Sequence, residues 1–116
     1  MADWQRLRAR YAQLTWRQRL ANLASTLRRA GSAAADPRTA ASARDLLREG
    51  AWIIEWSQSD TPIDVLAQLA PIQLELVLLH AAWDQAPGPV RPLLTFRTSA
   101  MSERLLELSQ AGGEDE

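Results

Sequence analysis

One acidic residue, Glu55, stands inside an aromatic and aliphatic run, WIIEW, at positions 52–56. A carboxyl group in an apolar pocket has a raised pKa and can act as a general acid or base. On a helix, however, Glu55 lies on the same side as Arg44 and Arg48, away from the stripe that contains Ile54. The spacing therefore predicts a glutamate exposed to solvent and not a catalytic acid.

The single histidine, His80, is followed four positions later by Asp84, so a hydrogen bond between the two side chains is expected on a helix. No serine or second histidine stands at a spacing that suggests a catalytic triad, and no Glu-x-x-His pair suggests a metal site in a bundle. Cysteine is absent, which excludes thiol catalysis and cysteine-ligated metals. We expect no enzyme, no cofactor and no metal. An enzyme would need polar groups converging around His80, Asp84 and an arginine.

Two arginines, Arg97 and Arg104, interrupt an apolar stripe near the end of the chain. Their aliphatic stems can lie along a core while the guanidinium groups reach a carboxylate. The acid-rich region 60–84 is the expected source of that carboxylate, and an anionic ligand is the alternative.

Charge is distributed unevenly, although the net charge is only −1. Residues 1–50 contain ten arginines and four acidic residues, whereas residues 51–116 contain three arginines and ten acidic residues. Because arginine binds phosphate and carboxylate well, the alternative function is binding of an anionic ligand or a nucleic acid. The residues that would carry it are Arg6, Arg10, Arg17 and Arg28. Nucleic-acid binding has little other support, because neither a recognition-helix signature nor a glycine-rich phosphate loop is present.

Two tryptophans, Trp52 and Trp56, are four residues apart and share the helix face opposite the aliphatic stripe. One interpretation is that a short N-terminal helix folds back and covers them with its stripe of Trp4, Leu7, Tyr11 and Leu14. Another is an exposed aromatic patch where a partner protein docks. A homodimer that exchanges the N-terminal helix lies between the two. The predicted partner-binding residues are Trp4, Tyr11, Trp52 and Trp56.

The elements that position these residues are predicted to be helices, because alanine and leucine dominate and β-branched residues are few. Thr15 and Gln18 fit a capping box that separates two N-terminal helices. The stretch AGSAAADP, residues 30–37, reads as a linker that ends with Asp36 as N-cap and Pro37 in first helical position.

The second half of the chain contains two further breaks. Pro71 is expected to break or restart a helix, and APGPVRP, residues 86–92, to form a turn. Residues 71–86 carry two apolar stripes, which is typical of a helix central in its bundle. The prediction is an all-α fold, a four-helix bundle of 16–30, 37–57, 71–86 and 90–110, with short helices 3–13 and 62–70.

Two segments, LTWRQRLANLASTLRRAGS and LLREGAWIIEWS, resemble a group of small uncharacterised helical proteins of cyanobacteria. The shared features are an Arg/Gln–Leu–x–Asn–Leu–Ala–Ser helix and a Glu–Trp–Ser/Thr helix end. The resemblance covers about residues 3–60 and, more weakly, the SERLLELS helix. It implies an all-helical bacterial protein of the cytoplasm and supplies no activity.

The length of 116 residues predicts one domain, 1–116, with an N-terminal helix in 1–14 and a frayed acidic tail at 111–116. No long apolar run or secretory signal is evident, so we expect no membrane partner and a cytoplasmic location. The leading hypothesis is a non-enzymatic interaction module that binds another protein or a second copy of itself.

Overall fold

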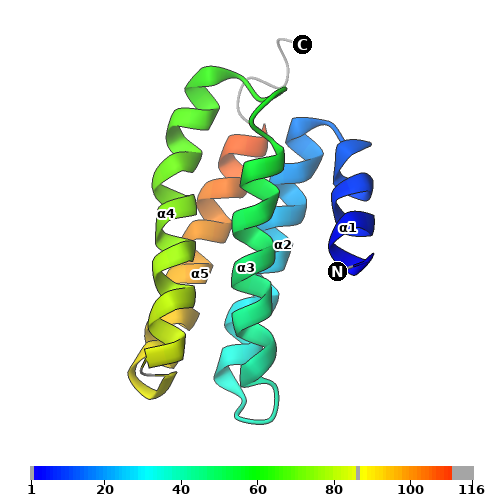
Figure 1. Cartoon of the computed structure of the whole chain (residues 1–116). Helices are drawn as coiled ribbons and strands as arrows, with labels where there is room; N and C mark the ends of the chain where they lie inside the picture. Colours follow the sequence, from blue (N-terminus) through cyan, green and yellow to red (C-terminus); the bar gives the residue numbers. More distant parts are fainter. Residues whose placement is uncertain (1, 86, 111–116) are drawn as a thin grey trace.

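The computed structural model describes residues 2–85 and 87–110, and this part of the chain is all-α, without a strand. Figure 1 shows the helices in chain order. Their bounds are α1 Ala2–Ala12, α2 Trp16–Ala35, α3 Ala40–Trp56, α4 Ile63–Gln85 and α5 Pro87–Gln110. The predicted fold class is confirmed. The predicted tail, 111–116, lies outside the described residues.

Helix α2 has the most extensive packing, first against α5 and then against α3. Helix α4 packs against α3 and α5, and α1 lies outside against α3 (Figure 1). A single apolar core lies between α2, α3, α4 and α5. Its fully buried large side chains are Leu20, Leu23, Leu27, Leu47, Ile53, Ile54, Leu69, Leu76, Leu94 and Leu105. Leucine supplies most of this core, in keeping with its high helix propensity.

The predicted capping box at the start of α2 is confirmed. The backbone N–H of Gln18 donates to Thr15 Oγ1 at 3.2 Å, and the backbone N–H of Thr15 donates to Gln18 Oε1 at 2.9 Å. Both bonds satisfy amide groups that a helix start leaves unpaired. The cap therefore fixes where the chain turns from α1 into α2.

Thr15→Ala is expected to lower the free energy of unfolding by about 1 kcal/mol, because the N-cap bond is lost. Urea denaturation followed by circular dichroism measures the change. Ser25→Ala, at an exposed position inside α2, is the control and is expected to change stability by less than about 0.5 kcal/mol. Equal effects of the two substitutions would contradict a stabilising cap.

The predicted linker at 30–37 is wrong, because α2 continues through Gly31 to Ala35. Asp36 is the C-cap of α2, and α3 begins only at Ala40, after a turn at 37–39. The Arg38 guanidinium donates to the Asp36 carboxylate at 3.0 Å, and the backbone N–H of Arg38 donates to it at 2.9 Å. These bonds hold the pKa of Asp36 below its ordinary value. Asp36 therefore shapes the turn between two helices and does not cap the second one.

The small residues near the end of α2 are used for close packing, not for a linker. Thr95 Oγ1 of α5 donates to the carbonyl of Gly31 at 3.2 Å, and Arg91 Nε donates to the carbonyl of Ala34 at 2.8 Å. Side-chain donors on α5 thus bind main-chain oxygens of α2 directly. A larger residue than glycine or alanine would hold the two helices further apart.

Pro71 does not break its helix, and the predicted pair 62–70 and 71–86 is one continuous helix, α4. A proline costs one backbone hydrogen bond inside a helix. Here the helix is held on both sides of that position by buried Leu69 and Ile72, whose burial outweighs the loss. Tertiary packing has overridden the local signal.

The predicted turn at 86–92 is also wrong in extent, since α5 begins at Pro87 and not at residue 90. The first turn of a helix leaves its N–H groups unpaired, so prolines are tolerated there. The proline-rich segment therefore starts a helix, and Pro92 lies inside it.

Candidate protein-docking surface

The aromatic stripe of α1 packs within the chain, against Trp56 of α3. The Trp4 ring lies 6.5 Å from the Trp56 ring in an edge-on arrangement, and the Tyr11 ring lies 6.2 Å from it. Tyr11 is only 1% exposed. Leu7 and Leu14 are half-buried against the core. The N-terminal helix thus folds back as one interpretation predicted, and Tyr11 is a core residue in this conformation.

Trp52 is not covered in the same way, and 42% of it is exposed. Its ring stacks on that of Trp56, with 6.0 Å between centroids and 23° between planes. Trp4, Trp52 and Trp56 therefore form one aromatic cluster, which we call the tryptophan cluster. Only its Trp52 end faces largely into solvent.

Trp52 forms a ridge between two grooves. The first groove, of about 470 Å³, lies between α3 and α4 and has Ala51, Leu76 and Val77 among its lining residues. The second, of about 270 Å³, lies between α1 and α3 and is lined by Trp4, Gln5, Arg8, Arg48, Trp52 and Trp56. We call Trp52 with its two grooves the Trp52 ridge.

Charged and polar side chains border the ridge on both sides. The Arg48 guanidinium lies 5.0 Å from the centre of the Trp4 ring, a cation–π contact. On the α4 side, Gln73 Nε2 donates to Glu55 Oε1 at 3.2 Å and to the carbonyl of Ala51 at 3.3 Å. Glu55 is exposed, which confirms its prediction as a solvated residue. It lacks the apolar enclosure that would make it a catalytic acid.

His80 lines the α3–α4 groove and is half-buried. The side chain of its predicted partner, Asp84, lies outside the described residues. Among the residues that the structure describes, no three histidine or acidic side chains gather as a metal site.

The four arginines proposed for anion binding do not converge. Arg17 donates to the carbonyl of Ser109 at 3.0 Å, and Arg28 donates to Ser102 Oγ at 3.0 Å, so both are held against α5. Arg6 and Arg10 are exposed on α1, which packs on α3. The alternative hypothesis of an anionic ligand therefore has two separate pairs of arginines, one exposed on α1 and one held against α5.

Arg97 pairs inside the bundle as the sequence predicts. Its Nε and Nη2 atoms donate to the two oxygens of Glu75, at 2.5 and 2.8 Å. This carboxylate raises the pKa of Arg97 above its ordinary value. Arg104 binds Gln68 of α4 and lies 3.4 Å from Glu107. The pair Arg97–Glu75 ties α5 to α4.

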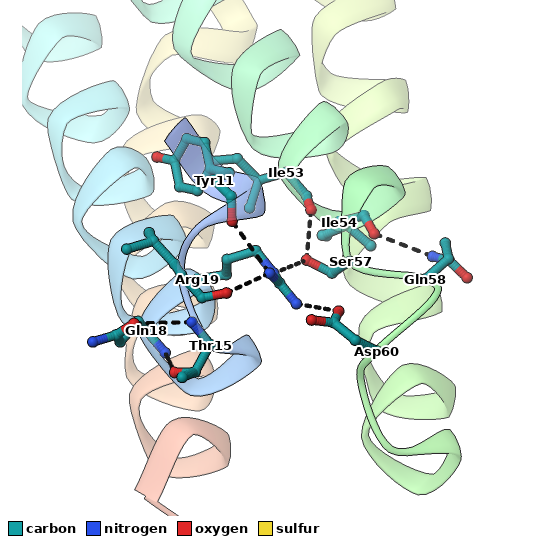
Figure 2. A network of polar contacts seen from close by, with 10 residues as sticks. Tyr11, Thr15, Gln18, Arg19, Ile53, Ile54, Ser57, Gln58 and Asp60 are labelled. Atoms are coloured by element: carbon teal, nitrogen blue, oxygen red, sulfur yellow. Dashed lines mark hydrogen bonds and ion pairs between the residues drawn. The ribbon is translucent and has the colours of Figure 1, made fainter. Parts of the chain in front are cut away.

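Sequence analysis did not single out Arg19, which it counted only among the ten arginines of residues 1–50. Figure 2 shows this side chain turned inward beneath α1, and it is 2% exposed. Its nitrogens donate to the carbonyls of Tyr11 (3.2 Å) and Leu14 (2.7 Å) and to Ser57 Oγ (3.1 Å). It also forms an ion pair with Asp60. A signal was present, because Arg19 is four positions before Leu23 and therefore lies at the edge of the apolar stripe of α2.

A comparison of the chain with protein-family models finds no match. Comparisons with curated proteins and with solved structures find none either. The functional argument therefore depends on the geometry of the chain itself.

Proposed function

We propose that this protein is a non-enzymatic interaction module that docks a partner protein across the Trp52 ridge. The observation that carries the proposal is a tryptophan 42% exposed between two grooves, on a helix whose other tryptophan, Trp56, is half-buried against α1. Tryptophan is enriched among the residues that dominate binding energies at protein interfaces. The proposed location is the cytoplasm, in keeping with the absence of cysteine.

The shape of the ridge favours an amphipathic helix as the docking element. Such a helix inserts apolar side chains at spacings of three and four residues, which suits two grooves on either side of one ring. Trp52 would be the central contact, and Trp4 and Trp56 would form the wall beside it. Arg48 and Glu55, seven positions apart along α3, both line the α3–α4 groove, so the charges of a partner helix would match only one direction along it.

Tyr11 supports this surface from below and is not expected to touch the partner. It is buried against Trp56, which carries the stacked Trp52 ring. The rigidity of this stack reduces the entropy that docking would otherwise cost.

Photo-crosslinking in the native cells tests the proposal. A photoreactive residue at Gln5, which lines the α1–α3 groove, is expected to give a discrete crosslinked product. The same residue at Glu103, exposed on α5, is the positional control and is expected to give none. Trp52→Ala in the Gln5 background is expected to reduce the product at least tenfold, since an interface tryptophan contributes about 2 kcal/mol or more. A product that persists with Trp52→Ala, or none from Gln5, would overturn the proposal.

A further inference from the structure

The groove between α1 and α3 carries positive charge that the described part of the chain does not neutralise. Two of its lining side chains are arginines, Arg8 from α1 and Arg48 from α3, and none of the others is acidic. Among the described residues, neither arginine has an acidic ion-pair partner or a hydrogen-bond acceptor. The Arg48 guanidinium lies over the Trp4 ring. A cation–π contact neutralises no charge and uses none of the guanidinium N–H donors.

Arginines on other parts of the molecule are bound to oxygen atoms of the chain. Arg97 donates to both carboxylate oxygens of Glu75, and Arg28 donates to Ser102 Oγ. Both Arg8 and Arg48 are exposed, so their donors face the open side of the groove. The groove can therefore bind a carboxylate without breaking a hydrogen bond within the described part of the chain.

We infer that the partner docked on the Trp52 ridge is an acidic amphipathic helix, whose carboxylates bind Arg8 and Arg48. This inference rests on the proposed function and adds the charge of the partner to it. A guanidinium binds a carboxylate through two parallel hydrogen bonds, which fixes position as well as charge. Opposite charge across an interface also speeds the encounter of the two proteins and selects against basic partners.

The α3–α4 groove sets the second requirement on the partner. Its lining includes the apolar side chains of Leu47, Ala51, Leu76 and Val77, which suit an apolar helix face. The two grooves flank Trp52, so the partner needs carboxylates directly beside its apolar stripe. Neighbouring residues differ by about 100° around a helix. The acidic residues are therefore expected one position away from apolar ones, along the edge that faces α1.

Glu55 limits where the carboxylates of the partner can lie. It is seven positions after Arg48, about 10 Å along α3, and lines the α3–α4 groove. Its side chain accepts from Gln73, which carries no charge. A carboxylate of the partner beside Glu55 would be repelled, so the acidic residues are expected at the Arg48 end of the ridge.

A nucleic-acid strand is the competing occupant, because arginines bind phosphates and tryptophan rings stack on bases. A strand that crosses the ridge, however, would bring phosphates toward Glu55. It would also place charged groups against the apolar lining of the α3–α4 groove. The combination of a cationic groove and an apolar groove favours an acidic helix.

Charge distinguishes the α1–α3 groove from the exposed face of α4. Ile63, Leu74 and Leu78 are more than half exposed there, and none of these side chains selects the charge of a partner. Ile63–Trp83 is long and apolar enough to cross a membrane, although its other face is buried in the core. The prediction that this two-sided helix is central in its bundle is wrong, because α4 packs against α3 and α5 and leaves one face exposed.

Charge reversal on α1, measured by the crosslinking yield from Gln5, tests the inference. Arg8→Glu is expected to lower the yield by about fivefold or more, because it places like charges opposite each other. Arg6→Glu is the matched control, since Arg6 is exposed on the same helix but does not line the groove. It is expected to change the yield by less than about twofold, because solvent screens a charge at that position. An unchanged yield with Arg8→Glu, or equal losses from both variants, would overturn the inference.

The crosslinked segment of the partner gives a second readout. Mass spectrometry is expected to find two or more aspartates or glutamates within about one helical turn of the crosslinked residue. Replacing the nearest of these by arginine is expected to restore the yield with Arg8→Glu, as a direct ion pair requires. A segment without acidic residues, a failure of this rescue, or a product destroyed by nuclease would overturn the inference.

The failure of this inference differs from the failure of the proposed function. The absence of any product from Gln5 would overturn both. A product that requires Trp52 but ignores Arg8→Glu would overturn only the acidic character of the partner.

Discussion

Arg19→Met is expected to lower the free energy of unfolding by about 3 kcal/mol, because three acceptors lose their donor at once. The carbonyls of Tyr11 and Leu14 and the hydroxyl of Ser57 all accept from this guanidinium. Methionine keeps the apolar stem and removes only the charged end, so the change isolates the polar network. Urea denaturation at neutral pH measures it, with the linear extrapolation to water.

Two further variants separate the network from the ion pair it contains. Asp60→Asn is expected to cost less than about 1 kcal/mol, because the Asp60 side chain is 52% exposed and solvent screens the pair. Arg19→Lys is expected to keep little of the stability that Arg19→Met loses. A single ammonium group cannot reach all the acceptors that are arranged around the planar guanidinium. If Arg19→Met lowered the free energy of unfolding no more than Asp60→Asn, the hydrogen bonds from Arg19 to its three neutral acceptors would contribute nothing to stability.

Gly31→Val is expected to destabilise the protein by about 2–3 kcal/mol, through overpacking where α2 meets α5. A Cβ at Gly31 would lie 2.5 Å from Thr98 Oγ1 and 3.7 Å from the backbone of Thr95. Thr98 is 1% exposed, and its hydroxyl donates to the carbonyl of Leu94 at 2.8 Å. Moving that side chain breaks the bond or separates the helices, which outweighs the helix propensity gained by replacing glycine. The midpoint of thermal unfolding, followed by circular dichroism, measures the effect.

Gly50→Ala is the matched control on the other side of the core. A Cβ there would lie 3.2–3.3 Å from the methyl ends of Leu23, Leu27 and Leu76. These are flexible side-chain ends, so a shift of a few tenths of an ångström accommodates them, and alanine gains helix propensity. The expected change is within about 1 kcal/mol of zero. If Gly31→Val destabilised the protein no more than Gly50→Ala, the result would contradict a close approach of α2 to α5.

Much of the fold follows from helical periodicity. The apolar spacing in 16–30 places Leu20, Leu23 and Leu27 in the core, and all three are fully buried. The Thr15 cap is also correct, because a capping box is a local interaction between residues three apart. These features depend on neighbouring residues alone, so one sequence is enough to predict them.

The errors arise where distant packing outweighs local preference. Gly31 is a linker signal by composition, but α5 approaches that position closely and requires a small residue inside the helix. Pro71 is a breaker by its chemistry, but buried residues on both sides hold α4 continuous. A window of ten residues contains no information about packing against α5 or the core. No local pattern could therefore predict that the helices continue through Gly31 and Pro71.

The candidate surface was predictable only in part. The i, i+4 spacing of Trp52 and Trp56 identifies an aromatic cluster, and the stripe of α1 identifies what could cover it. Helix α1 covers Trp56 and leaves Trp52 exposed. This difference depends on where the α1–α2 turn places α1 against α3. That placement depends in turn on Arg19, whose inward direction follows from the paired acceptors in α1 and the α3–α4 connection.

The acceptors of Arg19 in α1 and in the α1–α2 turn have a consequence for how this protein can change over evolutionary time. Two of them are main-chain carbonyls, at Tyr11 and Leu14, and every amino acid carries that group. Substitutions on the exposed side of α1 therefore leave its attachment to the bundle intact. The helix can acquire new surface residues, and with them new binding preferences, while position 19 keeps it in place.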